Sequence, residues 1–201
     1  MKIRSLMISD PITVTEKATI TDAMEVMKNH SIRHLPVVGE GNVLIGFLTL
    51  SDLKQGLIPS LLGEVSLADL MIKNPIEVGP DDDIELAAQL LYKFKIGGMP
   101  VVENRKLVGI ITESDILMTF IEIMGILTSS SRIDVAINDE PGALEKALQI
   151  IHGSGGEIIS IGQISRETGK KIFFFRLAPC KTHQIVQALE QQGFEIVDTM
   201  G

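Results

Sequence analysis

The sequence has 201 residues, a net charge of −8, 45% hydrophobic and 22% charged residues, one cysteine and no tryptophan. These proportions are typical of a globular protein, and an acidic chain lacks the basic face that nucleic-acid binding requires. The lone Cys180 excludes an internal disulfide, and without an apolar run of about 18 residues or a signal peptide we expect a cytoplasmic protein and no membrane binding.

The first half of the chain contains an internal repeat. At a shift of 64 residues, 12 of the 33 positions from Leu6 to Val38 are identical, where chance gives about 2. After one deletion the shift becomes 63, and a polar motif also aligns: Gly46, Thr49, Ser51 and Asp52 with Gly109, Thr112, Ser114 and Asp115. We therefore expect one repeat at 1–63 and a second at 64–127.

Each repeat predicts the same series of elements. An extended segment at Thr13-Val14 precedes a helix whose apolar residues recur with helical spacing from Ile20 to Met27. Two short β-rich runs at 35–38 and 44–48 then form a hairpin, and a last helix begins near Ser51. The matching parts of the second repeat are Glu77-Val78, 84–91, 99–102, 107–111 and Ser114.

The polar motif lies in each repeat where a strand turns into a helix. Its hydroxyls and carboxylate are the groups that cap helix N-termini. The same groups also suit a ribonucleotide, because a carboxylate accepts hydrogen bonds from ribose hydroxyls while hydroxyls and helix N–H groups hold phosphate. These two interpretations differ in whether Asp52 and Asp115 face open clefts or are consumed as helix caps.

These residues give the family resemblance. The repeats resemble tandem cystathionine-β-synthase-type (CBS) domains through the Gly-h-h-Thr-x-x-Asp motif and the His34 to Val38 stretch. The resemblance implies two clefts that take AMP, ADP, ATP or S-adenosylmethionine as regulatory ligands, with no required cofactor. It implies that Asp52 and Asp115 hold ribose and that Thr49 and Thr112 hold phosphate or ribose. The other expected nucleotide-binding residues are Thr13, Arg33, His34, Leu35, Pro36, Ser51, Glu77, Val78, Gly98, Met99, Pro100 and Ser114.

The hairpin register predicts that the two clefts differ. In an antiparallel hairpin the start of the first strand lies beside the end of the second, which places Arg33-His34 next to Thr49. Gly97-Gly98 then lie beside Thr112. We therefore expect phosphates to prefer the cleft beside Thr49, where Arg33 can grip them, and no side chain from this position in the other cleft. In the alternative, Arg33 merely lies on the surface and the glycines merely permit a turn.

The pattern changes after a polar linker at 128–132. Alternation at 133–137 predicts a strand, and Pro141-Gly142 precede a helix with an apolar face from Leu144 to Ile151. Two strands around a Thr168-Gly169 turn, a helix near Ile185 and a last strand at 194–197 complete a β-α-β-β-α-β order. The expected fold class is therefore α/β (α+β), with tandem repeats followed by a ferredoxin-like domain at 132–201.

The stretch from Val135 to Leu144 resembles the opening of an ACT domain, a regulatory module that often binds amino acids where two copies pair. The resemblance implies an amino-acid ligand at Asn138, Asp139, Gly142 and Ala143, although many ACT domains only dimerise. Two CBS repeats followed by one ACT domain resemble the acetoin-utilization protein B family. This resemblance implies a link to acetoin metabolism, a homodimer or higher homo-oligomer, and a regulated partner protein that the sequence does not identify.

No catalytic or metal-binding constellation is recognisable. The four histidines do not pair at ligand spacing with another histidine, a cysteine or a carboxylate cluster, so no metal is expected. No serine has a recognisable base and orienting partner. We therefore expect a non-enzymatic ligand sensor, and the alternative is an interaction module that uses its domains only for pairing.

Overall fold

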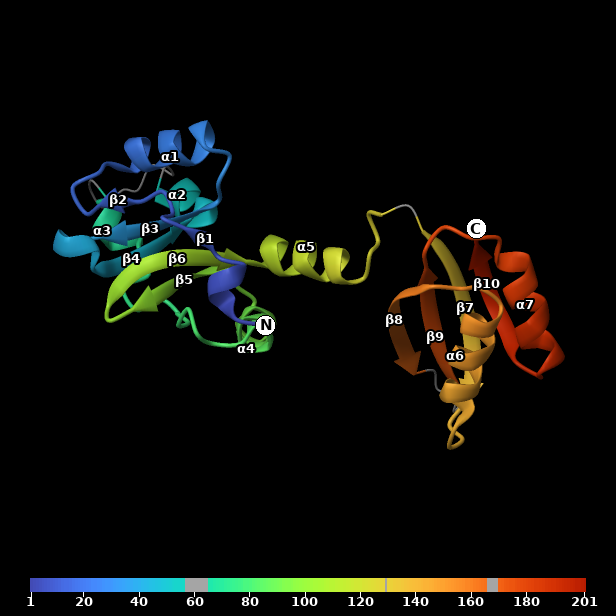
Figure 1. The fold of residues 1–201 in the computed structure, drawn as a ribbon. Helices are drawn as coiled ribbons and strands as arrows, with labels where there is room; N and C mark the ends of the chain where they lie inside the picture. Colours follow the sequence, from blue (N-terminus) through green and yellow to red (C-terminus); the bar gives the residue numbers. More distant parts are fainter. Residues whose placement is uncertain (57–64, 129, 166–169) are drawn as a thin grey trace. The chain divides into compact units, whose positions relative to one another are not determined.

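A computed structural model describes residues 1–56, 65–128, 130–165 and 170–201, and it contains two compact units. The first is Met1–Leu117 and the second Met118–Gly201, and each is described by itself (Figure 1). The structure combines helices with sheets in both units, which confirms the expected α/β class. The expected repeat boundary at 63/64 and the Thr168-Gly169 turn lie outside the described residues.

The first repeat forms a three-stranded sheet with helices packed against it. Thr19 caps the first helix through a reciprocal pair of bonds with Asp22, and Ala23 and Met27 are its buried residues. Leu35, Val37 and Leu48 provide the sheet's share of the same core. The elements are β2 (Val14–Thr15), α1 (Ile20–Asn29), β3 (His34–Val38), η2 (Glu40–Asn42), β4 (Leu44–Thr49) and α2 (Leu50–Gly56).

The second repeat has the same plan, as the sequence identity predicts. Ala87 and Leu91 are the buried residues of its first helix, and Met99, Val101 and Ile111 line the sheet side of the core. Val78 forms an isolated parallel bridge to Val101 where the first repeat has strand β2. The elements are α3 (Leu67–Leu70), α4 (Ile84–Phe94), β5 (Gly98–Glu103), β6 (Lys106–Thr112) and α5 (Glu113–Ile123).

The leading segment of each repeat packs on the other repeat, which the repeat alignment does not predict. Strand β1 (Ile8–Ser9) pairs with β6, and Ile3 from the preceding turn η1 (Ile3–Ser5) lies in the core of the second repeat (Figure 1). Conversely, Ile72 exchanges backbone hydrogen bonds with Phe47 on β4, and Leu67 lies in the core of the first repeat. The two repeats are therefore completed by exchanged segments.

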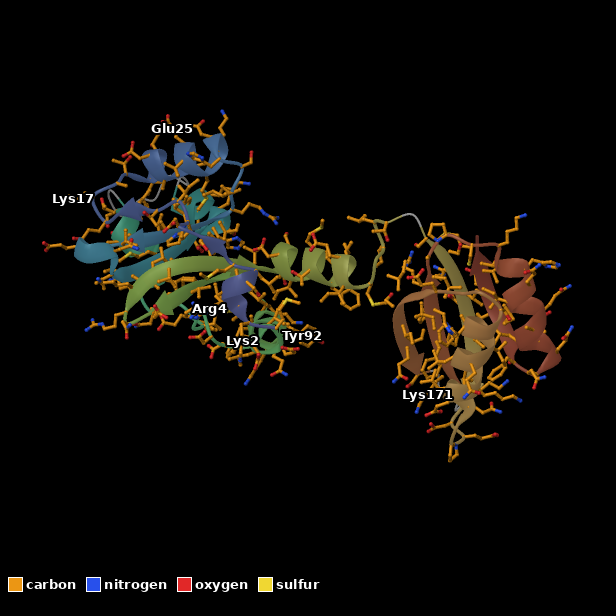
Figure 2. The ribbon with its side chains drawn as sticks, viewed as in Figure 1. Lys2, Arg4, Lys17, Glu25, Tyr92 and Lys171 are labelled. Atoms are coloured by element: carbon orange, nitrogen blue, oxygen red, sulfur yellow. The ribbon has the colours of Figure 1, made fainter. Side chains whose placement is uncertain are left out.

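Charges reinforce the exchange at the N-terminus. Lys2 lies 2.9 Å from Asp83, and Arg4 lies 2.7 Å from Asp81, at the turn that precedes α4; both cations lie beside this helix in Figure 2. The Lys2 ammonium holds the pKa of Asp83 below its usual range. The Asp81 to Asp83 run, which the sequence presents only as an acidic helix start, therefore also binds the N-terminal segment.

The second unit is a four-stranded antiparallel sheet in the order β10-β7-β9-β8. Both helices pack on one face, because Ala147 and Ile151 of α6 and Ile185 and Leu189 of α7 share one core with β7 and β9 (Figure 1). The elements are β7 (Ser131–Asn138), α6 (Ala143–Gly153), β8 (Ile158–Ser165), β9 (Lys170–Leu177), α7 (Thr182–Gln191) and β10 (Glu195–Met200). This arrangement confirms the ferredoxin-like prediction.

The strand after the expected linker begins two residues before Ile133. Ser131 is 3% exposed and pairs with Leu177, and its hydroxyl donates to the Cys180 carbonyl while accepting from the Cys180 N–H, both at 3.0 Å. The last residues of the expected linker therefore belong to strand β7, because the Ser131 hydroxyl is satisfied by hydrogen bonds inside the fold.

An ionic group is buried on the sheet face that points away from the helices. Asp134 is 4% exposed, and its Oδ1 lies 3.0 Å from Nε of Arg132 without a well-oriented hydrogen bond between the two atoms. Burial raises the pKa of the Asp134 carboxyl, against the opposing effect of Arg132. Arg132 also pairs with Asp198 on β10.

Candidate functional site

The two polar motifs have the same geometry. In each, Oδ2 of the aspartate accepts from the threonine backbone N–H at 2.8 Å and from the threonine hydroxyl at 2.7 Å, in the pairs Thr49–Asp52 and Thr112–Asp115. Each aspartate N–H points back to the threonine Oγ1 at 3.3 Å. Each pair therefore forms a reciprocal capping box at the start of α2 or α5, in which the threonine is the N-cap residue and one oxygen of the aspartate accepts from its backbone N–H.

This geometry determines whether the threonine hydroxyls can donate or only accept hydrogen bonds. The single proton of a hydroxyl is its only means of donating, and in both motifs that proton goes to the carboxylate. The threonine oxygens and the carboxylates are therefore arranged as acceptors, which matches the donor O–H groups of a ribose better than the acceptor oxygens of a phosphate. A phosphate in these clefts has to find its donors elsewhere.

One pocket of about 450 Å³ lies beside Thr112 and Ser114, and we name it the Thr112 pocket. It is built from both repeats, since its other walls come from the N-terminal segment and the first repeat. Six of its lining residues are apolar: Ile8, Pro11, Ile12, Ile32, Pro36 and Ile110. Its charged or imidazole-bearing lining residues are Asp10, Arg33 and His34. An apolar chamber with a few polar groups at one end is the usual form of a small-molecule site.

A second pocket of about 370 Å³ lies beside Thr49 and Ser51, and we name it the Thr49 pocket. Its lining also combines the two repeats: Arg33, His34, Leu50 and Lys54 from the first, and Gly97 and Glu113 from the second. It therefore has more charged groups and fewer apolar ones than the Thr112 pocket.

The expected hairpin register is correct, but its consequence for the clefts is partly wrong. His34 pairs with Thr49, and Gly98 pairs with Thr112, as predicted. Arg33 and His34 nevertheless line both pockets, so the cleft beside Thr112 does have side chains from this position. The register describes each sheet alone, whereas the pockets form where the sheets of the two repeats pack together.

His34 lies at this junction. A Cβ on Gly97 would stand 3.1 Å from its Nε2, and a Cβ on Gly98 would stand 3.3 Å from its Cγ. The ring also stacks on Phe47, with 5.9 Å between ring centroids. Burial, helped by the nearby Arg33 charge, lowers the pKa of His34, while Glu113 and Asp115 act in the opposite direction. His34 is therefore a neutral hydrogen-bonding group at pH 7.

The other expected nucleotide-binding residues are not among the lining residues of the two pockets. The side chains of Leu35, Val78 and Met99 lie in the cores, since alternate strand residues face opposite ways, and they can offer a ligand only backbone atoms. Pro100 and Gly98 are buried, Thr13 is half-buried and Glu77 is exposed, and none of these four is among the lining residues of the two pockets. The same holds for Asp52 and Asp115, which lie behind the threonines that they bond. The lining residues that sequence reasoning missed are Ile8, Asp10, Pro11, Ser31, Ile32, Leu50, Lys54, Ile110 and Glu113. Most of them come from the partner repeat or the exchanged segment, and no local pattern marks them.

The ferredoxin-like unit has a pocket of about 340 Å³ at the start of α6, the Gly142 pocket. Asn138, Gly142 and Ala143, three of the four residues at which the sequence suggests an amino-acid ligand, line it together with Lys146 and other charged residues. Gly142 has a left-handed backbone (φ 82°), and a Cβ there would meet nothing within 4 Å, so the turn faces open space. Asp139 does not line this pocket, because its carboxylate pairs with Lys171 at 2.7 Å.

Within the described ranges, no group of three or more His, Cys, Asp or Glu side chains is placed to hold a metal ion. Over the same ranges, no helix has the length and apolar character needed to cross a membrane.

Comparison with protein families finds the same three parts in the same order, two repeats and a C-terminal domain. Residues 3–58 and 67–122 match the family model of the CBS domain, and residues 129–200 match that of the TTHA0829-like ACT domain. A curated relative, an L-aspartate semialdehyde sulfurtransferase of Methanocaldococcus jannaschii, is 30% identical over 119 residues. The match covers 59% of this chain but only 23% of that enzyme, so the chain spans less than a quarter of its length.

Three solved structures resemble the first part of the chain. An acetoin-utilization protein from Vibrio cholerae is 32% identical with a TM-score of 0.57, over 63% of this chain and 94% of that one. The CBS domain pair of protein MJ0100, in complex with 5′-methylthioadenosine and S-adenosyl-L-methionine, is 30% identical with a TM-score of 0.55, over 60% and 95%. The protein CBSX2 in complex with AMP is 27% identical with a TM-score of 0.55, over 61% and 97%.

Proposed function

Because the chain belongs to the CBS domain family and ends in a TTHA0829-like ACT domain, we propose that it is a non-catalytic sensor of adenosine-type nucleotides. The proposed ligands are AMP, ADP, ATP or S-adenosylmethionine, bound in the clefts of the CBS pair. Similar CBS pairs are described in complex with S-adenosylmethionine and with AMP, which supports this ligand class.

The Thr112 pocket carries this proposal. Its apolar walls, including Ile12 and Ile110, suit a flat base, and the oxygen of Thr112, whose proton goes to Asp115, is an acceptor for a ribose hydroxyl. Arg33 and the Ser114 hydroxyl supply donors for an anionic group at the polar end. The pocket thus offers, in one space of about 450 Å³, the three kinds of contact that a nucleotide needs.

The test is calorimetry of the full chain with AMP, ATP and S-adenosylmethionine, together with thermal unfolding. A ligand that binds only the folded state raises the unfolding temperature, by an amount that grows with its concentration. We expect binding by at least one of these ligands and no release of phosphate from ATP over many protein equivalents. Multiple turnovers of ATP would contradict the sensor, and the absence of binding by all three would favour the alternative below.

The alternative is a pairing module that binds no nucleotide. One observation favours it: Oδ2 of both Asp52 and Asp115 already caps a helix, so neither motif requires a ligand to explain its polar residues. Sedimentation of the full chain with and without AMP separates the two functions. A pairing module associates equally in both conditions and shows no ligand-dependent change in stability.

For the second unit, we propose an amino-acid ligand in the Gly142 pocket. Lys146 in the lining suits a carboxylate and Glu140 suits an ammonium group, while Lys170 and Glu195 pair with each other at 2.6 Å. Thermal unfolding with each of the standard amino acids tests this, and Lys146→Ala is expected to abolish any stabilisation found. A cytoplasmic location, homo-oligomerisation, an unidentified regulated protein and a link to acetoin metabolism complete the proposal.

A further inference from the structure

One cationic side chain is common to the linings of the Thr112 pocket and the Thr49 pocket. Arg33 lines the Thr112 pocket and the Thr49 pocket, and it also borders a third pocket, of about 590 Å³, beside Met24 and Met27 of α1. In the Thr112 pocket it is the only Lys or Arg among the described lining residues, and Asp10 opposes it. In the Thr49 pocket it is joined by Lys54 and opposed by Glu113. With His34 neutral, the formal charge of the lining is zero in the first pocket and +1 in the second.

The packing leaves little room for a second basic pair at the equivalent position. Gly97 and Gly98 align with Arg33 and His34 at the repeat shift, and the His34 ring occupies the space above both glycines. A Cβ on Gly98 would also stand 3.1 Å from Cγ2 of Thr112. The difference between Arg33-His34 in one repeat and Gly97-Gly98 in the other is therefore part of the packing between the repeats, because one imidazole and two glycines fill the junction together.

We propose that Arg33 is a single anion-binding group shared by the two pockets, so that the pair binds one phosphate-bearing ligand strongly and a second one weakly. The inference rests on the proposed nucleotide function. A guanidinium grips one phosphate through two parallel N–H donors, and a second phosphate at the same group meets both an occupied donor set and a like charge. The strong ligand belongs in the Thr49 pocket, where Lys54 assists. The Thr112 pocket, where Asp10 opposes Arg33 and no other Lys or Arg is among the described lining residues, then binds a phosphate-bearing ligand weakly and an uncharged adenosine-type ligand without this penalty.

The experiment is calorimetric titration of the full chain with AMP and, separately, with adenosine at low ionic strength. For the wild type we expect two AMP affinities that differ by about tenfold or more, and adenosine affinities that differ less. Arg33→Gln is expected to weaken the strong AMP site about tenfold or more and to leave adenosine binding unchanged. The matched control is Arg105→Gln, which removes the same charge from an exposed turn outside both pockets and should leave the two AMP affinities as they are.

A second measurement needs no variant. Raising the salt concentration should narrow the gap between the two AMP affinities in the wild type and have little effect on adenosine, because salt screens exposed charges such as Arg33. Two equal AMP sites in the wild type, or unequal sites that persist in Arg33→Gln, would overturn the shared-anion inference while leaving the sensor function intact. If neither AMP nor adenosine binds, the proposed function and this inference both fail.

Discussion

Replacing Ile3 by alanine should weaken the core of the second repeat, although Ile3 belongs to the sequence of the first. Its side chain is fully buried against Val78, Leu91 and Met99. The substitution removes three carbons, which at about 0.8 kcal/mol each gives about 2.4 kcal/mol, and the cavity left behind raises this to about 3–4 kcal/mol. At about 4 °C for each kcal/mol, we expect the unfolding temperature of the CBS unit to fall by about 12–16 °C.

Amide hydrogen exchange shows where the stability is lost. In Ile3→Ala, strands β5 and β6 should lose protection more than β3 and β4 do. Leu67→Ala is the matched control, because Leu67 aligns with Ile3 in the repeat, is 2% exposed, loses the same number of carbons and packs in the core of the first repeat. It should give the opposite pattern. If each substitution instead loosens the repeat that contains it in sequence, the exchanged packing is refuted.

Three further predictions concern single side chains. Asp52→Ala and Asp115→Ala should each weaken nucleotide binding at one cleft and cost about 1–2 kcal/mol of stability through the lost cap, measured by calorimetry and urea unfolding; unchanged stability in both would contradict the capping geometry. The pKa of His34 is lower in the folded state than in the unfolded state. The contribution of neutral His34 to stability is therefore fully present above about pH 6.5 and is lost as the pH falls through the folded pKa. His34→Gln should flatten this dependence between pH 7.5 and 5, and an unchanged slope would remove His34 as its source. Asp134→Val should leave the unfolding temperature of the ACT unit equal or higher, since it replaces a buried charge that lacks a well-oriented hydrogen bond to Arg132, and a fall of more than about 5 °C would show that the ion pair stabilises the fold.

The elements themselves follow from the sequence, because their signals are local. Helical spacing at Ala23 and Met27 and alternation at Ile133, Val135 and Ile137 appear in the structure as buried faces. The duplication transfers each assignment from one repeat to the other. The βαββαβ order predicts the ferredoxin-like sheet because few topologies accommodate that order of elements.

What the sequence does not show is which surfaces meet. Strand β1 has two residues, too few for a periodic pattern, and the match of Met7 to Met71 reports ancestry without naming a packing partner. The structure places these methionines at Gly109 and Gly46, each on the other repeat. The hairpin register likewise places Arg33 only near Thr49, whereas in the structure Arg33 also lines the Thr112 pocket, across the junction between the repeats. Long-range packing of this kind leaves no mark within a window of neighbouring residues.

The exchange of leading segments bears on how such a pair arises by gene duplication. Neither half carries within its own stretch the segment that completes its core, since Ile3 serves the second half and Leu67 the first. An ancestor with a single half would complete itself only by trading segments with an identical copy, in a symmetric dimer. Fusion of two such genes would keep that interface and free each half to diverge alone, as His34 and Gly98 have done at equivalent positions.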